Sequence, residues 1–321
     1  MTALLLGKRV VVTGGAGFLG SFLVKKLGDR GVAEVTVPRK RNYDLTLREG
    51  AAQLYEDTKP DVLFHLAARV GGIGANRENP GLFFHDNMAM GIHIVEEARR
   101  YGHLRKLIIV GTTCSYPKFT ATPFQEDDLW SGYPEETNAP YGIAKKALLV
   151  MIQAYRQQYG LQGIYLIPAN LYGPGDNFDL ETGHVIPALI RKFLEAKEQC
   201  KPAVTVWGSG SVSREFLYAE DAADGILRAA ELYDDAEPVN LASGVEIFIK
   251  DLVNLVRDLV DYQGEVVWDS SKPDGQPKRR LDTERASNRF GFRAGTSLHT
   301  GLKATIEWYR QAHRELAGSK A

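Results

Sequence analysis

Short apolar runs alternate with longer helical patterns along the first half of the chain. Runs rich in valine, isoleucine and leucine are typical of buried strands, and apolar residues three or four positions apart indicate amphipathic helices. The runs predict strands over residues 8–13, 32–37, 62–66, 107–110 and 164–167, and the helical patterns cover residues 18–29, 87–101 and 144–159. This alternation predicts an α/β fold of the Rossmann type, with a doubly wound parallel sheet.

The pattern changes after residues 172–175, where the later segments become shorter and mixed. Helices are predicted over residues 186–197 and 219–233, with a strand over residues 204–207. We therefore expect a Rossmann domain over residues 1–174 and a smaller C-terminal α/β domain over residues 175–321. We expect some later strands, such as residues 239–241, to return to the first sheet.

The composition of the 321-residue chain is that of a soluble globular protein, with 44% hydrophobic and 25% charged residues. The 39 basic and 40 acidic residues give a net charge of −1, which indicates no cationic surface for nucleic acid. The apolar runs are far shorter than the ~20 residues of a membrane helix, and the N-terminal one lacks the basic flank of a signal peptide. With two cysteines, Cys114 and Cys200, a disulfide scaffold is not indicated. We expect a cytoplasmic protein with no metal site, no nucleic-acid partner and no membrane contact.

A glycine-rich turn follows the first predicted strand and opens the first predicted helix. Glycines three positions apart permit a tight turn in which backbone N–H groups approach a pyrophosphate, and the N-terminus of the helix favours negative charge. An ordinary strand–helix turn is the alternative. We expect the turn to bind a dinucleotide through Gly14, Gly15, Ala16, Gly17, Phe18, Leu19 and Gly20.

The end of the second predicted strand distinguishes between the possible dinucleotides. An NAD site usually places Asp or Glu there to bind the ribose 2′-hydroxyl. Here the strand is followed by Pro38, Arg39, Lys40 and Arg41, with no carboxylate. Because these cations would attract a 2′-phosphate, the sequence favours NADP(H), bound by Arg39 and Lys40, over NAD. A solvated basic turn is the alternative.

Tyr141 and Lys145 are four positions apart, so on a helix they lie on one face. A nearby cation stabilises a phenolate, and we expect Lys145 to lower the pKa of Tyr141 toward neutrality. The tyrosine could then exchange a proton with a carbonyl oxygen during hydride transfer, while the Thr112 hydroxyl binds the same oxygen. This pattern resembles the short-chain dehydrogenase/reductase superfamily, and the chain length resembles its extended branch, which acts on nucleotide sugars.

Cys114 and His184 add a second kind of chemistry. Cys114 follows the hydroxyl pair Thr112 and Thr113, and His184 precedes a predicted helix. A free cysteine is usually a buried apolar residue, and a histidine at a helix start is often only a cap. A thiol and an imidazole facing one sugar could instead act as a general acid/base pair, because protons beside a ketone are acidified by enolate delocalisation.

Several longer segments resemble the GDP-L-fucose synthase family, the GDP-4-keto-6-deoxymannose 3,5-epimerase/4-reductases. The resemblance runs almost from end to end and is most specific in residues 70–76 and 184–188. The other segments that carry it are residues 113–118, 138–145, 170–174, 176–178, 206–210, 214–217 and 271–275.

The resemblance implies a role for each candidate residue, with NADP(H) in the first domain and the GDP-sugar in the second. Cys114 and His184 would serve epimerisation, and Tyr141 and Lys145 would serve reduction with Thr112. The family usually has serines where this chain has Thr112 and Thr113, and often arginine inside the glycine turn. The residues implied for the cofactor also include Thr112, Tyr141, Lys145, Pro168, Asn170, Leu171 and His184. Those implied for the GDP-sugar are Asn170, Lys192, Trp207, Arg214 and Asp274.

Three other functions remain possible from the residues. A redox-neutral enzyme resembling GDP-mannose 3,5-epimerase would hold NAD tightly and tends to have lysine where this chain has His184. A nucleotide-sugar 4,6-dehydratase would need carboxylates beside Thr112, where the chain has Cys114 and Ser115. A non-catalytic dinucleotide sensor would be expected to lack Tyr141 or Lys145.

The two long predicted helices bear on the oligomeric state. Residues 87–101 and 144–159 could pair across a two-fold axis as a four-helix bundle, as in the superfamily that the chain resembles. The alternative is that both helices only cover one face of the sheet. We expect a homodimer.

Overall fold

The computed structural model describes residues 4–271 and 276–318. A six-stranded parallel sheet in the order β2-β1-β3-β4-β5-β9 forms the centre of its larger part. The strands are β1 (Arg9–Thr13), β2 (Glu34–Thr36), β3 (Val62–His65), β4 (Lys106–Val110), β5 (Gly163–Pro168) and β9 (Val239–Leu241). This sheet confirms the predicted fold class.

Burial explains which strands the sequence pattern locates well. Strands β3, β4 and β5 are buried along their whole length, and a strand covered on both faces appears as a continuous apolar run. β2 is shorter than the predicted residues 32–37 because it is the edge strand and pairs only with three residues of β1.

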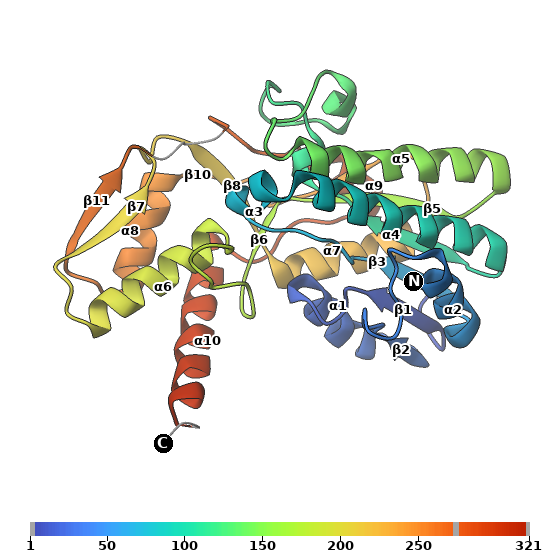
Figure 1. Ribbon diagram of the computed structural model, residues 1–321, viewed down its shortest axis with the longest axis horizontal. Helices are drawn as coiled ribbons and strands as arrows, with labels where there is room; N and C mark the ends of the chain where they lie inside the picture. The colour runs from blue at the N-terminus through green and yellow to red at the C-terminus, as the bar shows by residue number, and fades with distance from the viewer. Residues whose placement is uncertain (1–3, 272–275, 319–321) are drawn as a thin grey trace.

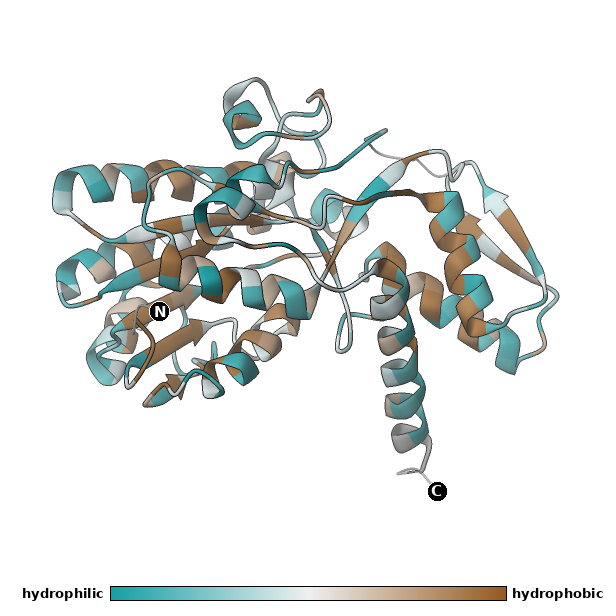
Figure 2. Ribbon diagram, turned by 180° about the vertical axis from the view of Figure 1, so that it is seen from behind, coloured by the Kyte–Doolittle hydropathy of each residue, from teal (hydrophilic) through white to brown (hydrophobic). Residues whose placement is uncertain are grey.

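Helices cover both faces of the sheet (Figure 1). On one face α4 (Pro80–Tyr101) packs beside α5 (Ala139–Tyr159), and on the other α1 (Phe18–Gly28) packs beside α7 (Ala219–Leu232). α2 (Arg48–Thr58) lies beside α4, and α9 (Glu284–Phe290) lies beside α7. Figure 2 shows hydrophobic residues along the central strands and hydrophilic ones on the outer turns of the helices.

Both long helices begin earlier than their apolar patterns predict. α4 begins at Pro80 rather than residue 87, and α5 begins at Ala139 rather than residue 144. Each has a proline in its first two positions, where a missing N–H costs nothing because those groups lack partners within the helix. The early start of α5 places Tyr141 in its first turn.

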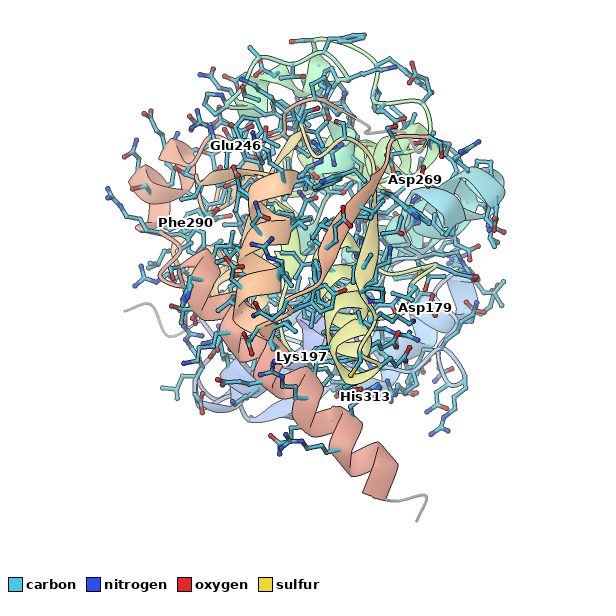
Figure 3. The ribbon with its side chains drawn as sticks, turned by 90° about the vertical axis from the view of Figure 1, so that its left-hand side faces the viewer. Asp179, Lys197, Glu246, Asp269, Phe290 and His313 are labelled. Carbon is cyan, nitrogen blue, oxygen red and sulfur yellow. The ribbon has the colours of Figure 1, made fainter. Side chains whose placement is uncertain are left out.

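The smaller part of the molecule has its own hydrophobic cluster. Two short sheets contribute to it, built from β6 (Asn170–Tyr172), β8 (Ser213–Tyr218) and β10 (Glu246–Phe248), and from β7 (Ala203–Trp207) and β11 (Glu265–Asp269). Its helices are α6 (Val185–Glu198), α8 (Ile249–Val260) and α10 (Leu298–Gly318). Figure 3, viewed from this end, shows α10 running past α8. The domain boundary at residue 174 stays a prediction.

The sheet order determines where a ligand can bind. β1 lies between β2 and β3, so the connections that leave the sheet there run in opposite directions. In doubly wound sheets, ligands bind beyond the carboxyl ends of the strands at such a point. Across residues 4–271 and 276–318, no helix has the length and apolar character needed to span a membrane. The same residues contain no cluster of three or more histidine, cysteine or acidic side chains suited to a metal ion.

Candidate active site

A cavity of about 980 Å³ lies beyond the carboxyl ends of the central strands. It is lined by residues from both parts of the molecule. Most of the residues predicted for the cofactor and the chemistry line it: Gly14, Ala16, Gly17, Phe18, Leu19, Gly20, Arg39, Lys40, Thr112, Cys114, Tyr141, Lys145, Pro168, Asn170, Leu171, His184 and Arg214.

The glycine turn leaves no room for side chains at its critical positions. Gly14 has φ +73°, and a Cβ there would lie 2.8 Å from the backbone nitrogen of Ala67. A Cβ on Gly20 would lie 2.2 Å from the carbonyl oxygen of Gly14. The cavity lining does not include Gly15, where a Cβ would lie 3.0 Å from the side chain of Val37. Gly15 therefore lets the turn pack against the sheet rather than face a ligand.

The N-terminus of α1 and the turn after β2 fit a dinucleotide phosphate. The cap residue of α1 is Gly17, and the first turn contains no acidic residue, so its N–H groups can bind an anion. Arg39 and Lys40 are exposed and line the same cavity, with Lys40 Nζ 3.6 Å from Asp44 Oδ2. The residues present therefore fit NADP(H).

Tyr141 and Lys145 lie in the first two turns of α5, where they are 7% and 2% exposed. The hydroxyl of Tyr165 donates a hydrogen bond to the carbonyl oxygen of Lys145 at 2.8 Å. Ser115, in the short 3₁₀ helix η1 (Thr113–Ser115), donates its hydroxyl to the carbonyl oxygen of Gly142 at 2.9 Å. These bonds fix the start of α5 to β5 and to η1.

The expectation that the pKa of Tyr141 is lowered toward neutrality is wrong. Burial raises the pKa of Tyr141, the neighbouring Cys114 raises it further, and a hydrogen bond with the Thr112 hydroxyl only partly opposes them. Burial also lowers the pKa of Lys145 from 10.5 to about 8. A tyrosine that stays protonated is the form that donates a proton, so the arrangement suits an acid for carbonyl reduction.

Cys114 is not the buried apolar residue, nor His184 the helix cap, that the sequence left as alternatives. Cys114 is partly exposed at the cavity wall rather than buried, and its backbone N–H donates to Thr112 Oγ1 at 3.2 Å. His184 occupies the cap position of α6, but among the described residues its side chain makes no capping hydrogen bond. Its ring is accessible from the cavity, while the surrounding protein lowers its pKa by desolvation.

The loop before His184 is held by backbone contacts to both parts of the molecule. The backbone N–H of Gly72 donates to the carbonyl oxygen of Thr182 at 3.3 Å. A Cβ on Gly183 would lie 2.4 Å from the carbonyl oxygens of Asn177 and Asp179. His184 is thus positioned by a tightly packed turn that also touches the glycine-rich residues 70–74.

Of the residues implied for the GDP end, the three that the structure describes do not all line the cavity. Arg214 lines the cavity, and its Nη1 donates to the carbonyl oxygen of Gln276 at 2.6 Å. Lys192 Nζ instead lies 5.4 Å from the ring centroid of Trp207, and neither belongs to the described cavity lining. Asp274 lies outside the described residues.

Several residues of the cavity wall were not predicted, because nothing in the sequence pattern marks them. Arg69 Nε donates to Asp86 Oδ2 at 2.6 Å, and Arg279 donates to Gln276 Oε1 at 3.1 Å. The first contact joins residues 17 positions apart, and the second lies within one short loop segment. Asp176 lies within the segment 176–178 that supports the family resemblance, so that signal could have found it.

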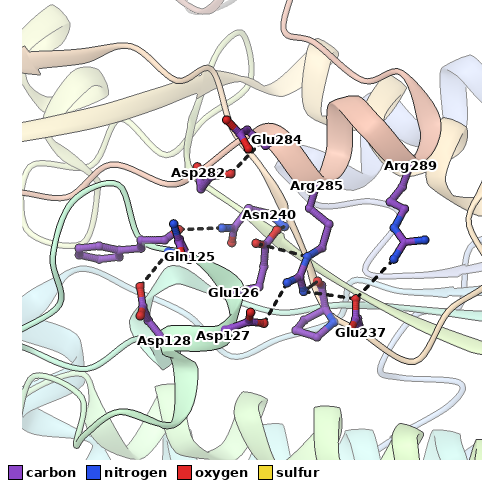
Figure 4. A network of polar contacts seen from close by, with 12 residues as sticks. Gln125, Glu126, Asp127, Asp128, Glu237, Asn240, Asp282, Glu284, Arg285 and Arg289 are labelled. Carbon is purple, nitrogen blue, oxygen red and sulfur yellow. Dashed lines mark hydrogen bonds and ion pairs between the residues drawn. The ribbon is translucent and has the colours of Figure 1, made fainter.

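A buried polar network holds the chain that follows Cys114 (Figure 4). Glu126, in η2 (Glu126–Trp130), accepts the backbone N–H of Asn240 at 2.9 Å and lies 3.6 Å from Arg285 Nε. The hydroxyl of Tyr116, two residues after Cys114, donates to Asn240 Oδ1 at 2.7 Å. The excursion from the sheet at residues 117–134 is therefore tied to β9 just before its start and near its middle.

Comparison with known proteins gives consistent relatives. Residues 10–242 match the NAD dependent epimerase/dehydratase family. The chain is 41% identical over 303 residues to the probable GDP-L-fucose synthase 1 of Oryza sativa subsp. japonica, which covers 94% of this chain and 92% of that protein. It is 36% identical to the GDP-L-fucose synthase of Escherichia coli (strain K12), and the match covers 97% of this chain and 99% of that protein. The crystal structure of a GDP-L-fucose synthetase from Naegleria fowleri bound to NADP superposes on this chain with a TM-score of 0.85 and 28% sequence identity. The superposition covers 95% of this chain and 94% of that one.

Proposed function

The chain belongs to the NAD dependent epimerase/dehydratase family and, within it, to the GDP-L-fucose synthases, and we propose that it catalyses the NADPH-dependent conversion of GDP-4-keto-6-deoxy-D-mannose to GDP-L-fucose. The reaction combines 3,5-epimerisation with 4-reduction. The observation that carries the proposal is that Cys114, His184, Tyr141 and Lys145 line one cavity with the glycine turn.

The reduction uses groups of the first part of the chain. The glycine turn, the N-terminus of α1, Arg39 and Lys40 would hold NADPH, which would supply the hydride for C4. Tyr141 donates its proton to O4, which the Thr112 hydroxyl helps to orient. The Lys145 cation stabilises the phenolate that remains on Tyr141 after the transfer.

The epimerisation uses the thiol and the imidazole. The carbons C3 and C5 flank the C4 carbonyl, so loss of a proton from either gives an enolate. One of Cys114 and His184 removes the proton and the other returns a proton to the opposite face, so the protons balance at each carbon. A hydrogen bond from the Thr112 hydroxyl to O4 stabilises the enolate.

Incubation of the protein with NADPH and GDP-4-keto-6-deoxymannose tests the function. The expected result is loss of the nicotinamide absorbance with formation of GDP-L-fucose, identified by NMR. Epimerised keto sugar without NADPH consumption would instead identify a redox-neutral epimerase. Absence of any turnover would contradict both.

We also propose a homodimer through α4 and α5. Phe84 and Ile92 on α4 are each 39% exposed, and Val150 on α5 is 48% exposed, which leaves apolar side chains on the outer face of this helix pair. A second copy of the same pair would cover them. Sedimentation should give a dimeric mass, and Ile92→Glu should lower it; a monomeric wild-type protein would contradict the proposal. The cytoplasmic location stays a prediction.

A further inference from the structure

Asp176 lines the catalytic cavity, and only one of its two carboxyl oxygens has a hydrogen-bond partner among the described residues. Its Oδ1 accepts the backbone N–H of Asn177 at 2.7 Å. Its Oδ2 is buried and has no hydrogen-bond partner among the residues that the structure describes. A buried polar atom without a partner destabilises the folded protein, so such an atom calls for an explanation.

The other carboxylates of the cavity wall all have side-chain partners. Asp44 accepts the hydroxyl of Thr46 at 2.7 Å, Asp86 pairs with Arg69, and Glu135 accepts hydrogen bonds from Thr137 and Asn138. Within residues 4–271 and 276–318, Asp176 alone among these carboxylates forms no ion pair or side-chain hydrogen bond. Burial raises its pKa to about 7, and no neighbouring cation offsets this effect.

The segment that carries Asp176 lies between the cofactor turn and the loop before His184. A Cβ on Gly173 would lie 3.7 Å from the ring of Phe18, which begins α1. On the other side, Asn177 Nδ2 donates to Thr182 Oγ1 at 3.0 Å, two residues before His184. Asp176 therefore lines the cavity beside the loop that leads to His184.

We propose that the Asp176 carboxyl binds a hydroxyl group of the GDP-sugar and so helps to select the sugar. A hydroxyl can donate a hydrogen bond to Oδ2 or accept one from the protonated carboxyl, whereas a phosphate group would be repelled once the carboxyl ionises. The keto sugar carries hydroxyls at C2 and C3, the second on a reacting carbon. This inference rests on the proposed function. The ribose hydroxyls of the cofactor are the other possible source of the same chemistry, and the test separates the two.

Steady-state kinetics and NADPH titration of three variants test the inference. Asp176→Leu keeps the approximate volume but removes both oxygens, and the KM for GDP-4-keto-6-deoxymannose should rise roughly 10–100-fold. The Kd for NADPH should change by less than about two-fold, because a single carboxyl–sugar bond is lost. Asp176→Asn retains an accepting oxygen, so its KM for the keto sugar should lie between those of the wild type and Asp176→Leu. Glu181→Gln removes an exposed carboxylate of the neighbouring loop and should match the wild type.

Substrate analogues distinguish recognition from packing. The wild type should bind either the 2-deoxy or the 3-deoxy keto sugar more weakly than the parent sugar. Asp176→Leu should lose that discrimination, and because each variant is compared with itself, a loss of stability does not affect the result.

Each contrary result has a separate meaning. If wild-type protein turns over no keto sugar, the proposed function is overturned and this inference with it. If the wild type is active but Asp176→Leu retains its KM and its discrimination, the inference alone is wrong. A rise in the Kd for NADPH with an unchanged sugar KM would assign Asp176 to the cofactor and overturn the proposal.

Discussion

Gly142 of α5 packs directly against the backbone of Cys114, and no side chain fits between them. A Cβ on Gly142 would lie 2.2 Å from the carbonyl oxygen of Cys114. The hydroxyl of Ser115 closes the contact by donating to the carbonyl oxygen of Gly142 at 2.9 Å. The helix that carries Tyr141 and the turn that carries the thiol are thus fixed to each other, so the groups for the two half-reactions share one geometry.

Gly142→Ala should disturb both half-reactions together. The added methyl must separate two backbones, and overpacking of this kind destabilises by about 1–3 kcal/mol. Denaturant unfolding should show that loss, and the rates of epimerisation and reduction should both fall. Gly81→Ala is the matched control, since a Cβ there would meet nothing within 4 Å. Wild-type stability and rates in Gly142→Ala would show that the contact does not matter.

Tyr141→Phe should abolish reduction and spare proton exchange. The variant lacks the proton that must reach O4, and loss of one general acid typically lowers a rate ~10²–10⁴-fold. Exchange at C3 and C5 should persist because Cys114 and His184 are unchanged. NADPH consumption and NMR in D₂O measure the two activities. Tyr133→Phe alters a tyrosine that is 66% exposed and should leave both unchanged; near-normal reduction by Tyr141→Phe would exclude the assigned role.

The reduction should lose rate as the pH rises through about 8. Burial lowers the pKa of Lys145 to about 8, so its cation is present below that pH and is lost above it. Tyr141 has a raised pKa and stays protonated over this range, so the acid itself does not titrate. The value of kcat/KM should fall on the order of tenfold per pH unit above about 8.

Lys145→Arg provides the control for this pH dependence. Arginine remains charged because its pKa exceeds about 12. The variant should be slower but should show no decline between pH 8 and 10. A wild-type profile that is flat over the same range would contradict the role of the Lys145 cation.

Replacing Arg39 and Lys40 by alanine should weaken NADPH binding selectively. Both side chains line the cavity beyond β2, where a 2′-phosphate would be bound by charge-assisted hydrogen bonds. The KM for NADPH should rise at least about tenfold, whereas that for NADH should change little. Arg41→Ala removes the adjacent exposed cation, which is not among the described lining residues, and serves as the control. Equal changes for both cofactors would contradict the assignment.

Local patterns in the sequence were sufficient for the parts of the site that depend on short spacings. The i, i+4 spacing of Tyr141 and Lys145 places them on one helix face, and the glycine turn is recognisable between its strand and helix. Residues brought together by packing gave no such signal. The ion pair of Arg69 with Asp86 and the missing partner of Asp176 follow from the three-dimensional arrangement alone.

Burial explains the wrong expectation for the pKa of Tyr141. The i, i+4 spacing indicates a favourable charge, but it contains no information on how deeply both side chains are buried. In the structure, burial dominates the pKa of each residue and acts in opposite directions on a phenol and an ammonium group. The contact of Lys192 with Trp207, away from the described cavity lining, likewise depends on how α6 packs beside β7.

The central claim is that one cavity performs two separable reactions, with Cys114 moving protons and Tyr141 serving reduction. Deuterium exchange tests it most directly. Wild-type protein in D₂O, without NADPH, should incorporate deuterium at C3 and C5 of GDP-4-keto-6-deoxymannose. Cys114→Ser keeps the size of the side chain but raises its pKa far above that of a thiol, so proton abstraction should nearly stop. With NADPH, this variant should still reduce C4 and give an unepimerised 6-deoxyhexose, whereas wild-type exchange and the wild-type product from Cys114→Ser would contradict the account.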